Sequence, residues 1–114
     1  MVRTRTSTRP SNPTANVPLL RFLKSNLFIK DCELAYSSGR HAAALAEMWT
    51  LLEILRKREQ IPAQYRNHAL KGEWAGWNDC HTEGDFVVVW KYGVVDGVDA
   101  VILAACGTYA HLFG

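Results

Sequence analysis

Two runs of β-branched and aromatic residues in the last third of the chain restrict its fold more than any other feature. The first run, residues 86–92, contains three consecutive valines, and the second, residues 98–106, has an apolar centre. Both runs have the composition of buried β-strands. The five residues between them, 93–97, begin and end with glycine, which predicts a hairpin loop. The two runs are therefore expected to pair as antiparallel strands.

Two helices are predicted ahead of these strands. In residues 41–59 the apolar side chains recur at spacings of three or four, which places them on one stripe of a helix; they are Leu45, Met48, Trp49, Leu52 and Leu55. Three cations in the last turn complement the helix dipole, and Pro62 prevents continuation. A shorter helix is predicted to start at Ser25 or Asn26 and to run through Tyr36, before the break at residues 37–39.

The remaining segments complete the predicted architecture. Residues 19–24 and 77–82 are predicted to be strands, residues 61–76 a loop and residues 83–85 a turn. The order is then β-α-α-β-β-β, with three antiparallel strands after two helices. This order predicts an α+β fold with the helices packed on one face of a small sheet.

The length of 114 residues fits one domain. Residues 1–17 are rich in Ser, Thr, Pro and Asn and have no apolar run, so their burial cannot offset the entropy cost of ordering. We expect a flexible extension at residues 1–17 and a folded domain at residues 18–114. No stretch of 18 apolar residues occurs, so no membrane-spanning helix and no membrane partner are expected.

Three widely spaced cysteines indicate the compartment. Cys32, Cys80 and Cys106 form an odd set without a Cys-x-x-Cys pair, which does not predict a disulfide framework or a zinc ribbon. We expect each to behave as a small buried apolar residue. A reducing, cytoplasmic location follows as the default.

The net charge of +2 conceals an uneven distribution. Residues 1–71 carry 12 of the 13 Lys and Arg residues with five acidic residues, a net charge of +7. Residues 72–114 carry one base and six acidic residues, a net charge of −5. A basic surface suits a polyanion such as RNA. A solvated helix face with a basic tail explains the composition equally well.

A polar cluster precedes the valine-rich strand. His68, Asp79, His81 and Asp85 lie within 18 residues, and imidazole is the side chain best suited to proton transfer near neutral pH. Histidines in loops are usually hydrogen-bonded surface residues, and Asp79 would equally brace a turn. Zinc is not expected, because the neighbours Cys80 and His81 would point to opposite faces of a strand.

A longer pattern with many fixed positions surrounds this cluster. It reads Tyr65-x-x-His68-x-Leu70-x-Gly72-x-Trp74-x-Gly76-x-x-Asp79-x-His81, then Asp85, and finally Gly107-Thr108-x-x-x-Leu112-Phe113-Gly114. Over residues 19–114 the chain resembles YafQ-type toxins of the RelE/ParE superfamily, which are ribonucleases of bacterial type II toxin-antitoxin systems. The resemblance implies a RelE/ParE-like fold, mRNA presented on the ribosome as substrate, no metal or other cofactor, no DNA binding by the toxin itself, and a cognate antitoxin as partner.

The resemblance also implies roles for single residues. The acid–base residues expected from it are His68, His81 and Asp85. Asp79 matches a polar residue of the site, and Phe113 matches an aromatic residue that holds the substrate. From the chemistry of RNA cleavage we add His111 as a second possible substrate contact near the C-terminus.

Two positions depart from the family pattern. Ala105 stands where family members usually have an arginine, and Tyr109 stands where they usually have a histidine. Tyrosine stays protonated at neutral pH, so Tyr109 could assist catalysis by donating a hydrogen bond. The cation that a phosphate transition state requires would then come from another residue; the candidates are Lys71, Arg66 and Lys91.

The leading hypothesis is therefore a metal-free mRNA endoribonuclease that inhibits translation. Two alternatives remain open. One is a catalytically impaired homologue that acts by binding an antitoxin, which the departures at Ala105 and Tyr109 would favour. The other is a ParE-like inhibitor of DNA gyrase.

Overall fold

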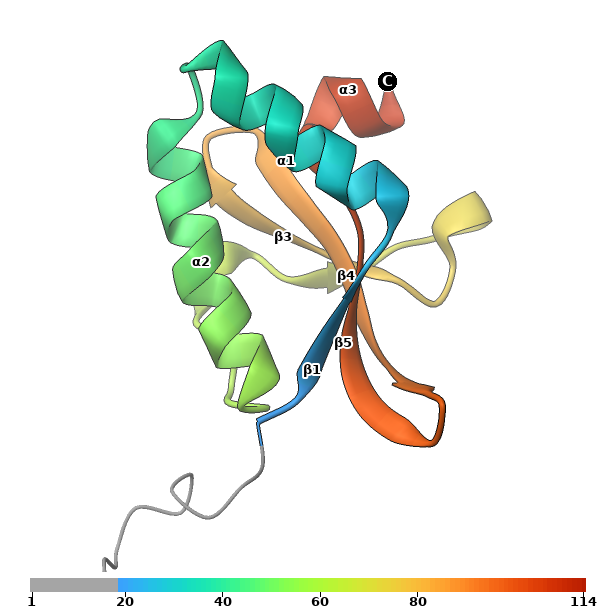
Figure 1. The fold of residues 1–114 in the computed structure, drawn as a ribbon. Coiled ribbons are helices and arrows are strands. Elements are labelled where there is room, and N and C mark those ends of the chain that lie inside the picture. The colour runs from blue at the N-terminus through green and yellow to red at the C-terminus, as the bar shows by residue number, and fades with distance from the viewer. Residues whose placement is uncertain (1–18) are drawn as a thin grey trace, which may run out of the picture.

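The computed structural model describes residues 19–114 and shows a five-stranded sheet with two long helices on one face (Figure 1). The strand order is β1-β5-β4-β3-β2, with β1 parallel to β5 and all other neighbours antiparallel. The strands are β1 (Arg21–Lys24), β2 (His68–Ala69), β3 (Asn78–Glu83), β4 (Phe86–Val95) and β5 (Val98–Thr108). The predicted α+β class is confirmed. The extension predicted at residues 1–17 lies outside the described residues.

The first helix, α1 (Asn26–Ser38), starts where predicted and continues two residues beyond the predicted end at Tyr36. The side chain of Ser25 accepts a hydrogen bond from the backbone N–H of Phe28 at 2.9 Å, which satisfies one of the free donors of the first turn. Gly39 ends the helix with a φ of 71°, a left-handed conformation that glycine adopts without a Cβ clash. α1 packs mainly against β5.

The second helix, α2 (Ala42–Arg56), is shorter than the predicted 41–59. The chain leaves the helix because Arg58 takes a left-handed backbone conformation, with a φ of 55°. Met48, Leu52 and Leu55 are buried against the sheet as the apolar spacing predicts. The placement of Trp49 on this stripe is wrong, because its side chain is 60% exposed.

The hairpin between β4 and β5 is tighter than the predicted loop at residues 93–97. Its turn consists of Asp96 and Gly97 alone, with φ values of 53° and 77°. Two positive φ values are those of a type I′ turn, for which Asp-Gly is a favoured sequence. Gly93 lies inside β4 instead, where an added Cβ would lie 2.6 Å from Ile102 Cδ1.

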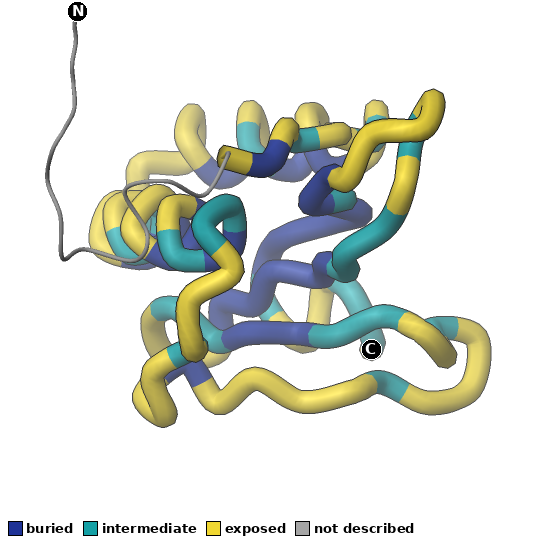
Figure 2. The backbone as a smooth tube through the Cα atoms, turned by 90° about the horizontal axis from the view of Figure 1, so that it is seen from below, coloured by how far each residue is buried: buried dark blue, intermediate teal, exposed yellow. Residues whose placement is uncertain are grey.

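The sheet face opposite α1 and α2 carries a second, smaller apolar cluster. The segment 61–76, predicted as a loop, contains the 3-10 helices η3 (Ala63–Tyr65) and η4 (Gly72–Trp74) and the strand β2, and the short helix α3 (Tyr109–Phe113) follows β5. Part of η4 and α3 packs over buried residues of β4 and β5. The most buried backbone runs through the central strands, while loops and outer helix turns are exposed (Figure 2). In residues 19–114 no helix has the length and apolar character needed to cross a membrane.

Candidate functional site

The sheet register places the central polar residues on the face away from α1 and α2. Cys80 in β3 is fully buried in the helix-side core, so its neighbours Asp79 and His81 point to the opposite face. Asp79 pairs across the sheet with His68 of β2 on one side and with Val89 of β4 on the other. The three polar residues therefore meet because two strands align them.

The carboxylate of Asp79 lies between the two imidazoles. Its Oδ1 is 3.1 Å from His68 Nδ1, and its Oδ2 is 4.0 Å from His81 Nε2. The two imidazole rings are stacked, with centroids 5.8 Å apart. Asp79 is fully buried, His81 is 14% exposed and His68 is 56% exposed. Among the described residues no hydrogen-bond donor with good geometry reaches either oxygen of Asp79.

Burial and charge shift the pKa values of this group. Burial raises the pKa of Asp79, although the nearby His68, His81 and Arg66 oppose that shift. Burial lowers the pKa of His81, and the positive charge of Arg66 lowers it further, against the opposing effect of Asp79. His81 is therefore biased towards its neutral form, in which one ring nitrogen can accept a proton.

The tautomer of His68 follows from a backbone contact. Its Nδ1 lies 2.9 Å from the carbonyl oxygen of Arg66. A carbonyl oxygen only accepts hydrogen bonds, so Nδ1 carries the proton. The other ring nitrogen, Nε2, is left for contact with a substrate at this exposed side chain.

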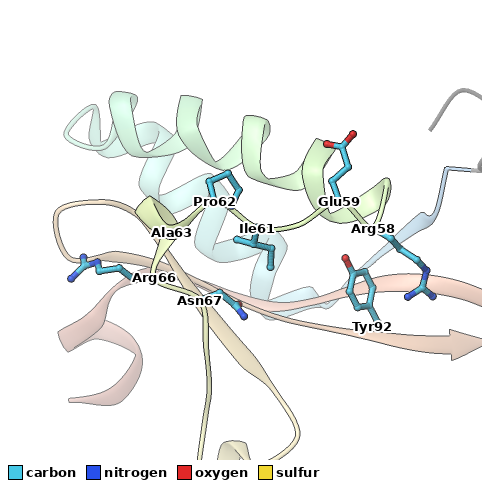
Figure 3. Close-up of a pocket in the computed structure, with 8 residues that line it drawn as sticks. All are labelled: Arg58, Glu59, Ile61, Pro62, Ala63, Arg66, Asn67 and Tyr92. Atoms are coloured by element: carbon cyan, nitrogen blue, oxygen red, sulfur yellow. The ribbon is translucent and has the colours of Figure 1, made fainter. Parts of the chain in front are cut away.

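Arg66 brings a positive charge next to this group. Its backbone is left-handed, with a φ of 46°, and its Nη2 donates to the carbonyl of Gly84 in the β3–β4 turn at 3.4 Å. Arg66 lines a surface hollow of about 760 Å³ (Figure 3). Within that view its guanidinium points away from Tyr92 and Arg58, towards the β3–β4 hairpin. The hollow itself does not include either imidazole.

The expected third acid–base residue, Asp85, takes a different position. It lies in the exposed β3–β4 turn, and its backbone carbonyl accepts a hydrogen bond from the N–H of Tyr109 at 2.8 Å. In residues 19–114 neither imidazole forms an ion pair with the carboxylate of Asp85. Asp79, expected as a polar residue of the site and not as an acid–base residue, holds the place between the imidazoles.

The C-terminal residues divide between the two sides of the sheet. Tyr109 is half exposed, and its ring lies 4.8 Å from that of Phe113. Phe113 also contacts Trp74 edge-on at 6.2 Å, over the same sheet face as Asp79. His111 is turned towards α1 instead, where its Nε2 lies 3.4 Å from Oδ1 of Asp31.

The other two expected cations do not join the imidazoles. Lys71 is exposed at the residue before η4. The Nζ of Lys91 lies 4.3 Å from the centre of the Trp77 ring. Of the three cations considered from the sequence, Arg66 is the one whose charge acts on both Asp79 and His81. Its left-handed backbone and its reach to the β3–β4 turn have no signal in the sequence.

Ala105 lies in the same row of the sheet as the polar residues. It pairs with Val89, which pairs with Asp79. Its side chain is fully buried in the second apolar cluster, and the partly buried residues that pack on this cluster are Leu70, Trp74, Trp77, Leu112 and Phe113. The position at which the sequence resemblance expects an arginine is therefore a packed apolar site.

The polar residues also form the one described group with the spacing of a metal site. One ligand atom each from His68, Asp79 and His81 lies within 4.8 Å of the others. Two imidazoles and a carboxylate suit a transition metal. Nδ1 of His68 donates its proton in a hydrogen bond to the Arg66 carbonyl. If that hydrogen bond is kept, only Nε2 of the ring can bind a metal.

Comparison with known proteins gives a consistent result. The sequence model described as "Bacterial toxin of type II toxin-antitoxin system, YafQ" matches residues 20–114. The "mRNA interferase toxin YafQ" of Escherichia coli K12 is 32% identical over 91 residues, which cover 79% of this chain and 91% of that protein. The E. coli DinJ-YafQ toxin-antitoxin complex contains a chain that is 30% identical, with a TM-score of 0.65 and coverage of 85% of this chain and 100% of that chain. A copper-bound mutant toxin from Helicobacter pylori is 33% identical, with a TM-score of 0.66 and coverage of 83% and 100%.

Proposed function

This chain belongs to the YafQ family of bacterial type II toxins, and from that membership we propose that it is an endoribonuclease that cleaves mRNA on the ribosome and is restrained by an antitoxin. The relative from E. coli is named an mRNA interferase, and YafQ of E. coli is also crystallised in a toxin-antitoxin complex with DinJ. The observation that carries the proposal for this chain is the fully buried carboxylate of Asp79 between two imidazoles.

The proposed reaction needs a base, an acid and a cation. The 2′-hydroxyl of the RNA attacks the adjacent phosphate, a base takes the 2′ proton, and an acid gives a proton to the departing 5′ oxygen. His81 is the base, because burial and Arg66 keep its imidazole neutral. His68 is the acid through Nε2, because Asp79 beside its Nδ1 stabilises the positively charged ring.

Arg66 supplies the positive charge that the phosphate transition state requires. Its guanidinium reaches the β3–β4 turn beside His81, and its charge already acts on His81 and Asp79. A preorganised cation of this kind contributes about 10²–10³ in rate. Tyr109 is exposed, with its ring tilted against that of Phe113; its hydroxyl donates a hydrogen bond to the substrate, or its ring contacts a base.

Substrate contacts complete the proposed site. Phe113 offers an aromatic surface on the same sheet face as Asp79. Lys71 is an exposed cation between β2 and η4, suited to a neighbouring phosphate. The backbone carbonyl of Asp85 accepts a hydrogen bond from the N–H of Tyr109, which connects the β3–β4 turn to the start of α3. His111 faces Asp31 of α1 and therefore helps to position α3 instead of transferring a proton to or from the substrate.

The proposed chemistry needs no metal, because the two imidazoles provide both proton transfers. A transition metal bound by His68, Asp79 and His81 would occupy the lone pairs that proton transfer requires. Because a similar toxin from H. pylori is crystallised with copper, metal dependence should be tested for the present chain. We expect cleavage to be unchanged by a chelator and inhibited by added Cu²⁺. Loss of activity on chelation, restored by a divalent ion, would reject the metal-free assignment.

The test of the proposal is a cleavage assay on ribosomes programmed with mRNA. His68→Ala and His81→Ala should each slow cleavage by about 10²–10⁴, the usual contribution of an acid–base group. His41→Ala is the matched control, because His41 lies on the helix side with its ring 5.2 Å from Phe86. Cleavage that survives both substitutions at the wild-type rate would overturn the catalytic assignment.

One observation favours a second candidate function. The buried position of Ala105 leaves β5 without a cation on the site face. A chain of this family with weak or absent catalysis would act by binding antitoxins. Copurification with an antitoxin, together with no cleavage by the purified wild type, would favour this function.

A further inference from the structure

Two of the three cysteines meet between α1 and β5. Cys32 of α1 and Cys106 of β5 are 74 positions apart in the chain, and their sulfur atoms are 3.6 Å apart. A disulfide requires sulfurs about 2.05 Å apart. Forming the bond would therefore require a change in the side-chain torsion angles of one or both residues. Within residues 19–114 no second thiol is hydrogen-bonded to Cys80, whose thiol donates to Asn67 Oδ1 at 3.2 Å.

The backbone around the pair is held by an independent contact. The carboxylate of Asp31, the neighbour of Cys32, is buried, and its Oδ2 accepts a hydrogen bond from the backbone N–H of Cys106 at 3.1 Å. α1 also packs mainly on β5. The approach of the two sulfurs is thus fixed by helix–sheet packing and not by two mobile surface chains.

The two thiols differ in exposure and acidity. Cys32 is partly exposed and lines a hollow of about 550 Å³ between α1 and α2, whereas Cys106 is fully buried. The hydrogen bond between the thiols lowers the pKa of Cys32, against the opposing effect of burial. The same hydrogen bond strongly raises the pKa of Cys106, and burial raises it further. Cys32 is therefore the more reactive thiol, since the thiolate is the nucleophile.

We propose that Cys32 and Cys106 are a peroxide-sensitive modification site that closes to a reversible intramolecular disulfide. The thiolate of Cys32 attacks one oxygen of hydrogen peroxide, so that an S–O bond forms, the O–O bond breaks and hydroxide leaves. The sulfur of Cys106 then attacks the sulfur of the Cys32 sulfenic acid and releases its proton. The S–O bond breaks, and its oxygen leaves as water. Two thiols are oxidised, and one peroxide is reduced to two waters.

The bond would fasten the strand that leads into the C-terminal helix. Cys106 is two residues before Thr108, whose side chain caps α3. The disulfide would join this part of β5 to α1 and restrict the unfolded chain by closing a long loop. The inference concerns the thiols and the helix–sheet contact, and it stands or falls independently of the proposed nuclease activity.

The test is oxidation of the purified full chain with hydrogen peroxide, followed by thiol titration and mass spectrometry under denaturing conditions. The wild type and Cys80→Ser should each lose two titratable thiols and the mass of two hydrogen atoms, as monomers. Cys32→Ser and Cys106→Ala should form no intramolecular bond. Oxidised wild type should melt several degrees higher, about 5 °C or more, and dithiothreitol should reverse the shift.

Three results would overturn the proposal. In the first, all three thiols of the wild type still titrate after peroxide treatment. In the second, the only disulfide product is a dimer linked between chains. In the third, peptide mapping finds Cys80 in the bond. Because Cys32→Ser changes a partly exposed residue, it keeps the test decisive even if Cys106→Ala is poorly folded.

Discussion

Asparagine in place of Asp79 removes the charge between the two imidazoles and keeps the shape of the side chain. The oxygens of Asp79 are 3.1 Å from His68 Nδ1 and 4.0 Å from His81 Nε2. At such distances a pair of unit charges interacts by about 4–5 kcal/mol at an effective dielectric constant near 20, and by about 1 kcal/mol in water. Because His68 is 56% exposed, its interaction lies between these limits.

This range sets the expected effect on the reaction. At 1.36 kcal/mol per factor of ten in rate, the loss of an interaction of this size from the transition state slows the reaction by about 5- to 10³-fold. We expect Asp79→Asn to slow single-turnover cleavage on programmed ribosomes by the same range. Asp85→Asn is the matched control for a carboxylate outside the imidazole pair and should slow cleavage less.

The same substitution should not weaken the fold at neutral pH. Because burial raises the pKa of Asp79, the folded protein keeps this proton to a higher pH than the unfolded chain does. The resulting stabilisation is complete below the ordinary pKa of 3.8 and is lost as the pH rises through the raised value. Above that pH the wild type buries a charged carboxylate, which costs free energy, whereas the amide of the variant stays neutral.

We therefore expect Asp79→Asn to combine slow cleavage with a melting temperature equal to or above that of the wild type at neutral pH. A folded variant that cleaves mRNA as fast as the wild type would refute the role of the carboxylate. A variant that melts well below the wild type would refute the reasoning about its burial.

Other predictions follow from neighbouring residues. Arg66→Gln should slow cleavage by about 10²–10³, with partial recovery in Arg66→Lys, while Arg40→Gln on the helix side leaves the rate unchanged; equal rates for Arg66→Gln and the wild type would exclude Arg66 as the cation. Ala105→Arg should destabilise the fold by about 1–3 kcal/mol in urea unfolding, because the larger side chain overpacks the fully buried cluster. The control Ala110→Arg, on the exposed surface of α3, should leave the stability unchanged. Faster cleavage by Ala105→Arg at unchanged stability would show that the cluster has room for a guanidinium. Because the pKa of His81 is lowered in the folded protein, its contribution to stability is complete above the ordinary value of 6.5 and is lost as the pH falls through the lowered value. Melting curves of His81→Gln should lack this part of the pH dependence. A pH profile equal to that of the wild type would contradict the prediction.

Much of the fold follows from local patterns in the sequence. The valine-rich run before Tyr92 could only be a buried strand, and Ser25 and Gly39 were identifiable as helix boundaries. The exposure of Trp49 could not be predicted, because a helical stripe does not show how far the sheet extends beneath it. The two-residue strand β2 has no periodicity of its own and exists because β3 provides its hydrogen-bond partners.

The candidate site was predicted in its residue types and only partly in its geometry. His68 and His81 were expected together, and the structure places their rings 5.8 Å apart. The sequence does not distinguish Asp79 from Asp85 as their partner, since both carboxylates are close in the chain. The distinction depends on register, because Asp79 lies within β3 on the same face as His81 while Asp85 lies beyond the end of the strand.

The chemical nature of the cleaved ends tests the central claim most directly. Purified protein would be incubated with ribosomes programmed with a labelled mRNA, and the ends of each fragment would be identified. Transfer of a proton from the attacking 2′-hydroxyl to His81, and from His68 to the departing 5′ oxygen, predicts a 5′-hydroxyl on one fragment and a 2′,3′-cyclic phosphate on the other. A 5′-phosphate with a free 3′-hydroxyl, or an mRNA that stays intact, would contradict the account.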